Sequence, residues 1–233
     1  MSTPPEGGAG RTRLAAALYN GDVLRLADEV ARIESSGLDA LHVDVFDGRL
    51  VPDLAFAPRV VGALRECTSL ALEVHLVAEL PERFAPELAQ AGADLVLLQA
   101  EGAPMLYETL FAFREQNLRV GVALGLAAPL VVLEPVLGLC DAVLLLSRVT
   151  GEGTRGATFD PLVLPRVREV AGLIRAGKHA VELHVAGGVN RSNAAELSGA
   201  GAGALALGAG LYRVPDMAAE AAEIRRLTDG APA

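Results

Sequence analysis

Long apolar runs are missing from this sequence, because no stretch reaches the length that spans a membrane. The first residues also lack the charged start and apolar run of a signal peptide. We therefore expect a cytoplasmic protein that has no membrane partner.

Basic residues are scarce relative to acidic ones. The 20 lysines and arginines are outnumbered by 29 aspartates and glutamates, which gives a formal net charge of −9. Nucleic acids and anionic membranes select basic surfaces, so neither is expected as the main partner. A phosphate group would have to be bound locally, by backbone amides rather than by a basic surface.

Cysteines are also few. The chain has only two, Cys67 and Cys140, which lie far apart in the sequence and in apolar surroundings. We expect both to be buried free thiols of a protein from a reducing compartment.

Aliphatic residues are abundant, since 52% of the 233 residues are hydrophobic. A chain of this length and composition fits one large α/β domain better than two small ones. Residues 1–10 are rich in Pro and Gly and are predicted to form a disordered N-terminal tail. The domain is predicted to cover residues 11–228, with a C-terminal tail at 229–233.

Short apolar segments alternate with segments of helical periodicity along the chain. Pro129, for example, leads into a helix that is expected to end near Gly138. Eight strand–helix units in this length predict a single (β/α)8 TIM barrel. A doubly wound open sheet is the alternative, but no Gly-x-Gly-x-x-Gly turn follows the first strand. The predicted strands are 14–19, 39–46, 71–77, 95–99, 119–124, 142–146, 181–186 and 204–207.

Two of these strands carry polar residues near their ends. His42 and Asp44 share one face of the second strand, and His75 lies on the corresponding face of the third. Active sites of such barrels lie at the C-terminal ends of the strands, where all three residues fall. Any one of them alone is more simply a buried, hydrogen-bonded polar residue. The three together predict a site for one divalent metal ion, Zn, Fe, Mn or Co.

Two glycine-rich turns follow the last two predicted strands, at 186–190 and 207–211. Loops at these places commonly bind phosphate in barrels, because glycine lets backbone amides approach the anion closely. Ordinary turn glycines are the simpler alternative for either loop alone. The two loops together predict a phosphate site.

The same residues carry a family resemblance. The segment from His42 to Pro52, followed by Glu73 to Leu76, resembles the signature of ribulose-phosphate 3-epimerases. The resemblance implies that the two histidines and Asp44 ligate one metal ion, and that Asp44 is one of two catalytic acids acting from opposite faces of the substrate. The residues on the family's phosphate-contacting positions are Gly187, Gly188, Gly208 and Ala209.

One position departs from that pattern. Ala186 stands where the family has its second Asp, and alanine can neither transfer a proton nor bind a metal. His184, on the same strand face, is a candidate substitute; the alternative is a barrel-interior histidine hydrogen-bonded to Glu182 or Glu73. The loop after the sixth strand resembles the family's active-site lid in place only. Its Arg155 could reach a phosphate, with a solvated arginine as the simpler alternative.

These features together predict a metal-dependent epimerase or isomerase of a phosphorylated ketose, similar to ribulose-phosphate 3-epimerase but with an altered mechanism or substrate. Its partner is then a small-molecule sugar phosphate, and a homo-oligomer stays open. The alternatives are a lyase or one-base isomerase on a related sugar phosphate, and a non-catalytic sugar-phosphate-binding paralogue.

Overall fold

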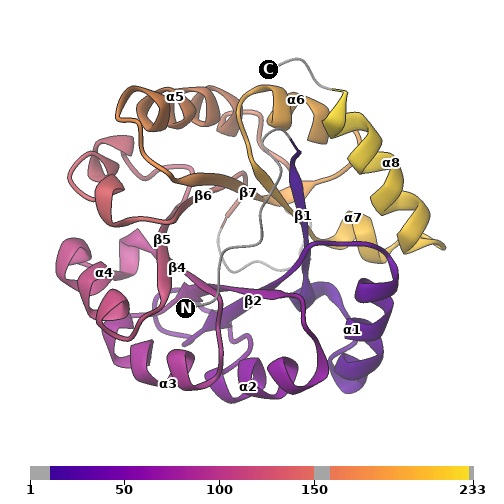
Figure 1. Ribbon diagram of the computed structural model, residues 1–233, viewed down its shortest axis with the longest axis horizontal. Helices are drawn as coiled ribbons and strands as arrows, with labels where there is room; N and C mark the ends of the chain where they lie inside the picture. The colour runs from indigo at the N-terminus through magenta and orange to yellow at the C-terminus, as the bar shows by residue number, and fades with distance from the viewer. Residues whose placement is uncertain (1–10, 150–157, 231–233) are drawn as a thin grey trace.

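Eight parallel strands form a closed barrel in the computed structural model, which describes residues 11–149 and 158–230. Each strand pairs with the next in sequence, and β8 returns to pair with β1, so the predicted TIM barrel is confirmed (Figure 1). The predicted tail at 1–10, Arg155 and the last three residues lie outside the described residues. The strands are β1 (Arg13–Ala17), β2 (Ala40–Phe46), β3 (Ala71–Val77), β4 (Leu95–Gln99), β5 (Arg119–Leu124), β6 (Ala142–Leu146), β7 (Glu182–Val189) and β8 (Ala204–Leu207).

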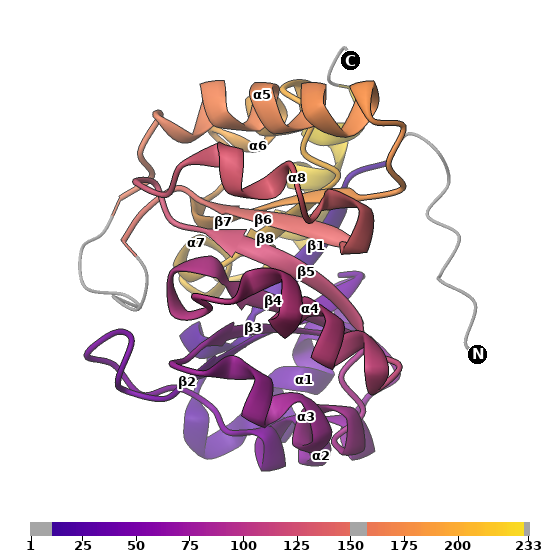
Figure 2. The same cartoon turned by 90° about the vertical axis from the view of Figure 1, so that its left-hand side faces the viewer.

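Helices surround the barrel on all sides, as the two perpendicular views show (Figures 1 and 2). None of the described helices is long and apolar enough to cross a membrane. The helices are α1 (Leu26–Ser35), α2 (Pro58–Cys67), α3 (Ala85–Gln90), α4 (Leu106–Glu115), α5 (Val163–Ala176), α6 (Ala194–Gly199), α7 (Ala209–Tyr212) and α8 (Met217–Asp229).

Two local predictions are wrong. The helix expected from Pro129 to Gly138 is instead two 3-10 turns, Leu130–Leu133 and Leu137–Leu139. Pro135 lies between the turns and has no N–H, so an α-helix could not continue through it. Cys67, the last residue of α2, is exposed rather than buried, whereas Cys140 is buried as expected.

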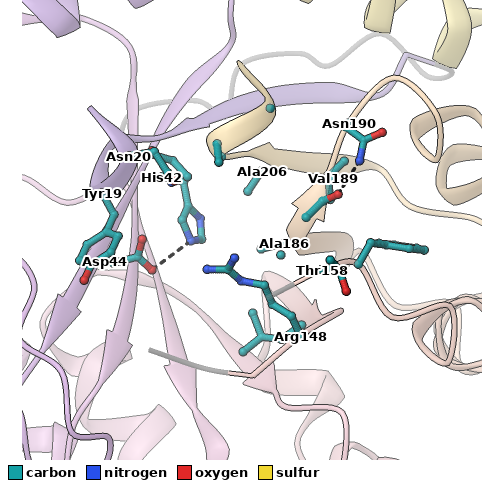
Figure 3. Close-up of a pocket in the computed structure, with 18 of the residues that line it drawn as sticks. Tyr19, Asn20, His42, Asp44, Arg148, Thr158, Ala186, Val189, Asn190 and Ala206 are labelled. Carbon is teal, nitrogen blue, oxygen red and sulfur yellow. Dashed lines mark hydrogen bonds and ion pairs between the residues drawn. The ribbon is translucent and has the colours of Figure 1, made fainter. Parts of the chain in front are cut away.

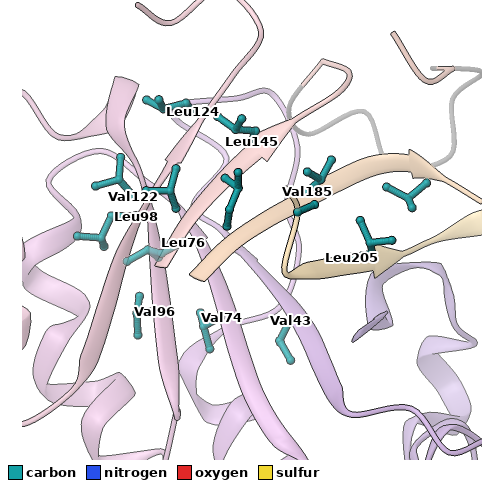
Figure 4. Close-up of a cluster of buried hydrophobic side chains, with 14 of the residues drawn as sticks. Val43, Val74, Leu76, Val96, Leu98, Val122, Leu124, Leu145, Val185 and Leu205 are labelled. Carbon is teal, nitrogen blue, oxygen red and sulfur yellow. The ribbon is translucent and has the colours of Figure 1, made fainter. Parts of the chain in front are cut away.

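The main core lies between the barrel and the helices. Alternate side chains of each strand point outward into it, so the strands contribute valines and leucines that are almost fully buried (Figure 4). The remaining side chains point into the barrel, where Leu95, Leu97, Leu144 and Leu146 pack with four alanines. This packing fills one side of the barrel interior.

A charged cluster occupies the N-terminal part of the barrel interior. The guanidinium of Arg13 on β1 lies 2.6 Å from a carboxylate oxygen of Glu73 on β3 and 2.7 Å from one of Glu182 on β7. His184 places Nε2 2.7 Å from Glu182 Oε2 and Nδ1 3.5 Å from Glu73 Oε2. The cluster therefore ties three strands together across the barrel.

Candidate functional site

Side-chain alternation and strand register bring three predicted ligands together. Asp44 on β2 is the register partner of His75 on β3, and His42 precedes Asp44 by two residues on the same inward face. Asp44 Oδ1 lies 3.5 Å from His42 Nε2 and 3.1 Å from His75 Nδ1. Each residue offers one ligand atom, and these atoms lie within 4.8 Å of one another. The spacing read from the sequence therefore corresponds to a real cluster at the C-terminal end of the barrel.

Electrostatics favour the charged forms of Asp44 and His42. Burial acts to raise the pKa of Asp44, but the two imidazoles, first His42 and then His75, outweigh it and hold that pKa well below its usual value. Burial acts in the opposite direction on His42, where the Asp44 carboxylate dominates and raises the pKa. Asp44 is thus an ionised carboxylate at neutral pH, next to two nitrogen donors.

The donor set suits a divalent transition metal. Metal–nitrogen and metal–oxygen bonds of about 2.0–2.2 Å in a tetrahedral site put neighbouring donors roughly 3.3–3.6 Å apart. The two observed contacts to Asp44, 3.5 and 3.1 Å, are close to this separation. Three protein ligands would leave one position open for another group, as catalytic metal sites do.

His75 has a further partner that the sequence analysis missed. Its Nε2 lies 2.8 Å from Oε1 of Gln99, the buried last residue of β4, and the Gln99 amide donates to Glu101 at 2.6 Å. The signal was present in the sequence, since Leu95, Leu97 and Gln99 alternate toward the barrel interior as the ligands do.

A cavity of about 460 Å³ opens above the cluster. Its volume lies within the range typical of small-molecule sites. The walls are formed by the ends of the strands and by both glycine-rich turns, so the predicted phosphate loops face the predicted ligands across one cavity. The predicted site residues that line it are His42, Asp44, His75, Gly187, Gly188, Gly208 and Ala209.

The first turn requires glycine for steric reasons. Gly187 and Gly188 have φ angles of +96° and +67°, which other residues rarely adopt. A side chain on Gly188 would place its Cβ 2.7 Å from the backbone nitrogen of Phe159. Asn190 secures the same turn by donating from Nδ2 to the Gly188 carbonyl at 2.8 Å. Sequence analysis did not single out this asparagine, and its place within the predicted turn was the only signal.

Ala186 lies inside the cavity wall, with a guanidinium nearby. Figure 3 shows Arg148 pointing into the cavity on the side of Ala186 that faces His42 and Asp44. The stem of Arg148 packs over Gly187, because a Cβ there would lie 2.8 Å from Arg148 Cγ. Arg148 follows β6 after Ser147, and no motif in the sequence identified it.

His184 lies deeper in the barrel than Ala186. Its contacts with Glu182 and Glu73 confirm the expectation of a hydrogen-bonded histidine in the barrel interior. Both ring nitrogens face carboxylates of the charged cluster, so the histidine is already engaged below the cavity.

Comparison with known proteins points to one family. The model of the ribulose-phosphate 3-epimerase family matches residues 13–212. Ribulose-phosphate 3-epimerase of Bacillus subtilis is 36% identical over 214 residues, which is 91% of this chain and 98% of that protein. The protein of the same name from Synechocystis is 34% identical over 214 residues, 91% of this chain and 92% of its own length.

Among solved structures, 3-keto-L-gulonate-6-phosphate decarboxylase of Vibrio cholerae is similar in fold, with a TM-score of 0.71. The superposition covers 95% of this chain and 99% of that one at 16% sequence identity. At such an identity the likeness concerns the fold, and it agrees with the closed eight-stranded barrel.

Proposed function

Because the chain belongs to the ribulose-phosphate 3-epimerase family, we propose that it is a metal-dependent isomerase of a phosphorylated ketose. One observation carries this proposal: His42, Asp44 and His75 converge at one end of a cavity whose other wall holds the two glycine-rich turns. A small sugar phosphate would fit with its carbonyl end toward these three residues and its phosphate at the turns. We further propose that proton transfer differs from the two-acid scheme, because Ala186 has no acid.

The metal would be held by Nε2 of His42, Oδ1 of Asp44 and Nδ1 of His75, the atoms that face one another. Mixed nitrogen and oxygen ligands accept Zn, Fe, Mn or Co. When bound, such an ion supplies positive charge that stabilises a developing negative charge on a substrate oxygen.

The phosphate would be bound by backbone N–H groups of Gly187, Gly188, Gly208 and Ala209. The positive φ angles of the first two support this proposal, since such turns can direct successive N–H groups to one side. Because the net charge is −9, the surface as a whole does not attract anions. A phosphate would therefore be bound by backbone amides close to it.

Asp44 would be the acid–base group on one face of the substrate and would remove the proton from the carbon next to the carbonyl. Its carboxylate is ionised and sits in the cavity wall, so it can accept a proton from a substrate held by the phosphate loops. Ala186 offers nothing to the other face of the substrate. Arg148 could stabilise negative charge there, but a guanidinium does not act as an acid or base at neutral pH.

That one-sided arrangement also supports a second candidate function. A single base such as Asp44 suffices for a lyase or one-base isomerase when proton removal and return occur on one face. A non-catalytic sugar-phosphate-binding paralogue is the third candidate. A cytoplasmic location and a homo-oligomer stay predictions.

The test combines metal analysis with a coupled assay of ribulose 5-phosphate turnover. We expect about one divalent metal ion per chain and turnover below the roughly 10 s⁻¹ of a typical enzyme. Asp44→Asn should abolish the remaining turnover, whereas Asp28→Asn, on the exposed face of α1, should not change it.

Absence of metal after purification and after addition of zinc, manganese or cobalt would contradict the proposed cofactor. Metal binding without ribulose 5-phosphate turnover would favour the one-base alternative, which a screen of related phosphorylated ketoses and keto acids would then test. Wild-type turnover at an ordinary enzyme rate would show that another group replaces the missing acid.

A further inference from the structure

A chain of hydrogen bonds runs from the candidate metal ligands to a backbone amide outside the cavity. Nε2 of His75 lies 2.8 Å from Oε1 of Gln99, and Nε2 of Gln99 lies 2.6 Å from Oε2 of Glu101. The other carboxylate oxygen of Glu101 accepts from the N–H of Gly125 at 3.0 Å. Three strand ends, those of β3, β4 and β5, are joined in this way.

The donor and acceptor of each hydrogen bond in this series follow from Glu101, the carboxylate at its outer end. A glutamate carboxylate has only acceptors, and it already accepts from the Gly125 amide. The Gln99 group that faces Glu101 must therefore be the NH2, which turns the Gln99 carbonyl toward His75. A carbonyl oxygen also only accepts, so Nε2 of His75 has to carry a hydrogen.

The hydrogen on Nε2 determines what His75 presents to Asp44 at the inner end of this hydrogen-bond series. With the hydrogen on Nε2, the neutral imidazole presents a bare lone pair at Nδ1, which lies 3.1 Å from Asp44 Oδ1. Two acceptors at this distance repel each other unless a proton or a metal cation lies between them. We propose that Gln99 and Glu101 are positioning residues, which fix the hydrogen on Nε2 of His75 and so keep Nδ1 available to a divalent metal. The metal part of this inference rests on the proposed function, whereas the position of the hydrogen does not.

The local backbone makes the arrangement rigid. Gln99 is 2% exposed and ends β4, and Glu101 belongs to the 3-10 turn Ala100–Gly102 that follows directly. A Cβ on Gly125 would lie 2.7 Å from Glu101 Oε1, and one on Gly102 would lie 2.3 Å from the carbonyl oxygen of Ala78. Both glycines allow an approach that any side chain would prevent. Partners held on rigid elements orient metal ligands well.

Histidine NMR tests the position of the hydrogen without any metal. The chain has only four histidines, so His75 can be assigned in the ¹⁵N-labelled, metal-free protein by comparison with His75→Gln. We expect a hydrogen on Nε2 that exchanges slowly with solvent, and exchange at least about tenfold faster in Gln99→Leu, because the acceptor is lost. Gln90→Leu, at an exposed position of α3, is the matched control and should behave as wild type. An unprotonated Nε2 in the wild type would overturn the inference.

Zinc affinity tests the consequence for the metal. Loss of a partner behind a ligating histidine typically weakens metal binding about 10–100-fold, and we expect this for Gln99→Leu. Glu101→Gln keeps a hydrogen bond but no longer dictates the direction of the Gln99 amide, so a smaller loss of affinity is expected. Glu115→Gln, at an exposed position of α4, should leave affinity unchanged.

The outcomes separate this inference from the proposed function. If the wild type binds no zinc but keeps the protected hydrogen on Nε2, the proposed metal is wrong and the assigned tautomer stands. If zinc binds with equal affinity to wild type, Gln99→Leu and Glu101→Gln, the positioning role is wrong. Should Gln99→Leu fail to fold, Glu101→Gln decides both measurements, because its side chain is at the surface.

Discussion

Ala186 is the residue at which the sequence departs from the family resemblance, which implies an Asp at this position. It lies in the cavity wall within β7, and only 7% of it is exposed. A carboxylate here would stand across the cavity from Asp44, so both faces of a bound ketose would have an acid–base group. Because this carboxylate is absent while Asp44 is present, we expect an altered mechanism rather than an inactive protein.

We predict that Ala186→Asp raises ribulose 5-phosphate turnover. A positioned acid or base typically contributes roughly 10²–10⁴-fold, although Arg148 nearby will pair with part of the new charge and reduce the gain. Ala206→Asp is the matched control, because Ala206 also lines the cavity but on β8. The coupled assay should show a gain for the first variant and none for the second; equal rates in both would contradict the assignment of position 186.

Glu182 is the residue with the clearest pH dependence. Burial acts to raise its pKa, but His184 and Arg13 outweigh burial and lower the pKa from 4.5 to about 2. A lowered carboxylate pKa stabilises the folded state above the unfolded value and loses that contribution as pH falls through the folded value. The relevant window is therefore from pH 4.5 down to about 2.

We predict that Glu182→Gln lowers the free energy of unfolding at pH 5 and that the difference from wild type shrinks toward pH 2. The shift corresponds to at most roughly 3–4 kcal/mol, since one pKa unit is about 1.4 kcal/mol. Urea denaturation across this pH range measures it. A difference between the two proteins that is constant with pH would mean that the ionisation of Glu182 is not coupled to folding.

At the scale of elements, the end of β7 is where the strand departs from regular pairing. The strand continues past Val185 with a shift in its pairing to β8, and it includes both glycines of the first turn. Sequence analysis predicted that this strand ends at 186. Two glycines with positive φ extend it to Val189 with irregular backbone, and both line the cavity.

We predict that Gly188→Ala weakens inorganic phosphate binding and lowers stability by about 1–3 kcal/mol. Its φ of +67° disfavours alanine, and the new Cβ would lie 2.7 Å from the backbone nitrogen of Phe159. Gly138→Ala is the control, since nothing lies within 4 Å of a Cβ there and its φ is not in the left-handed region. Calorimetric phosphate titration and urea denaturation measure both effects. Unchanged phosphate affinity in Gly188→Ala would contradict the phosphate site.

At the scale of the whole molecule, the interior cluster joins distant parts of the chain. Arg13, Glu73 and the pair of Glu182 and His184 come from β1, β3 and β7, so their contacts form only when the barrel closes. The side chain of Glu73 is 3% exposed, and it contacts both Arg13 and His184. Removing one member of such a cluster leaves buried charge without its partner.

We predict that Glu73→Ala lowers the free energy of unfolding by about 3–5 kcal/mol, the usual cost of breaking a buried ion pair. Glu223→Ala is the control, because its ion pair with Arg226 on α8 lies at the surface and should contribute nothing measurable. Urea denaturation at neutral pH compares the two. Equal effects of the two substitutions would show that the interior cluster does not stabilise the closed barrel.

The sequence by itself determined the features that depend on local periodicity. Five of the eight strands begin and end at the predicted residues, because buried parallel strands are short apolar runs bounded by turn residues. Side-chain alternation likewise predicted that His42, Asp44 and His75 share the inner face. Spacing within a strand is a property of the chain, so it can be read before folding.

Only the tertiary structure decided which side chains meet across strands. Gln99 reaches His75, and Arg148 lies over Gly187 beside Ala186, because barrel closure sets the register and the distances between strand ends. The same closure joined His184 to Glu73 below the cavity. These contacts depend on the separation of residues in space, which no local pattern in the sequence encodes.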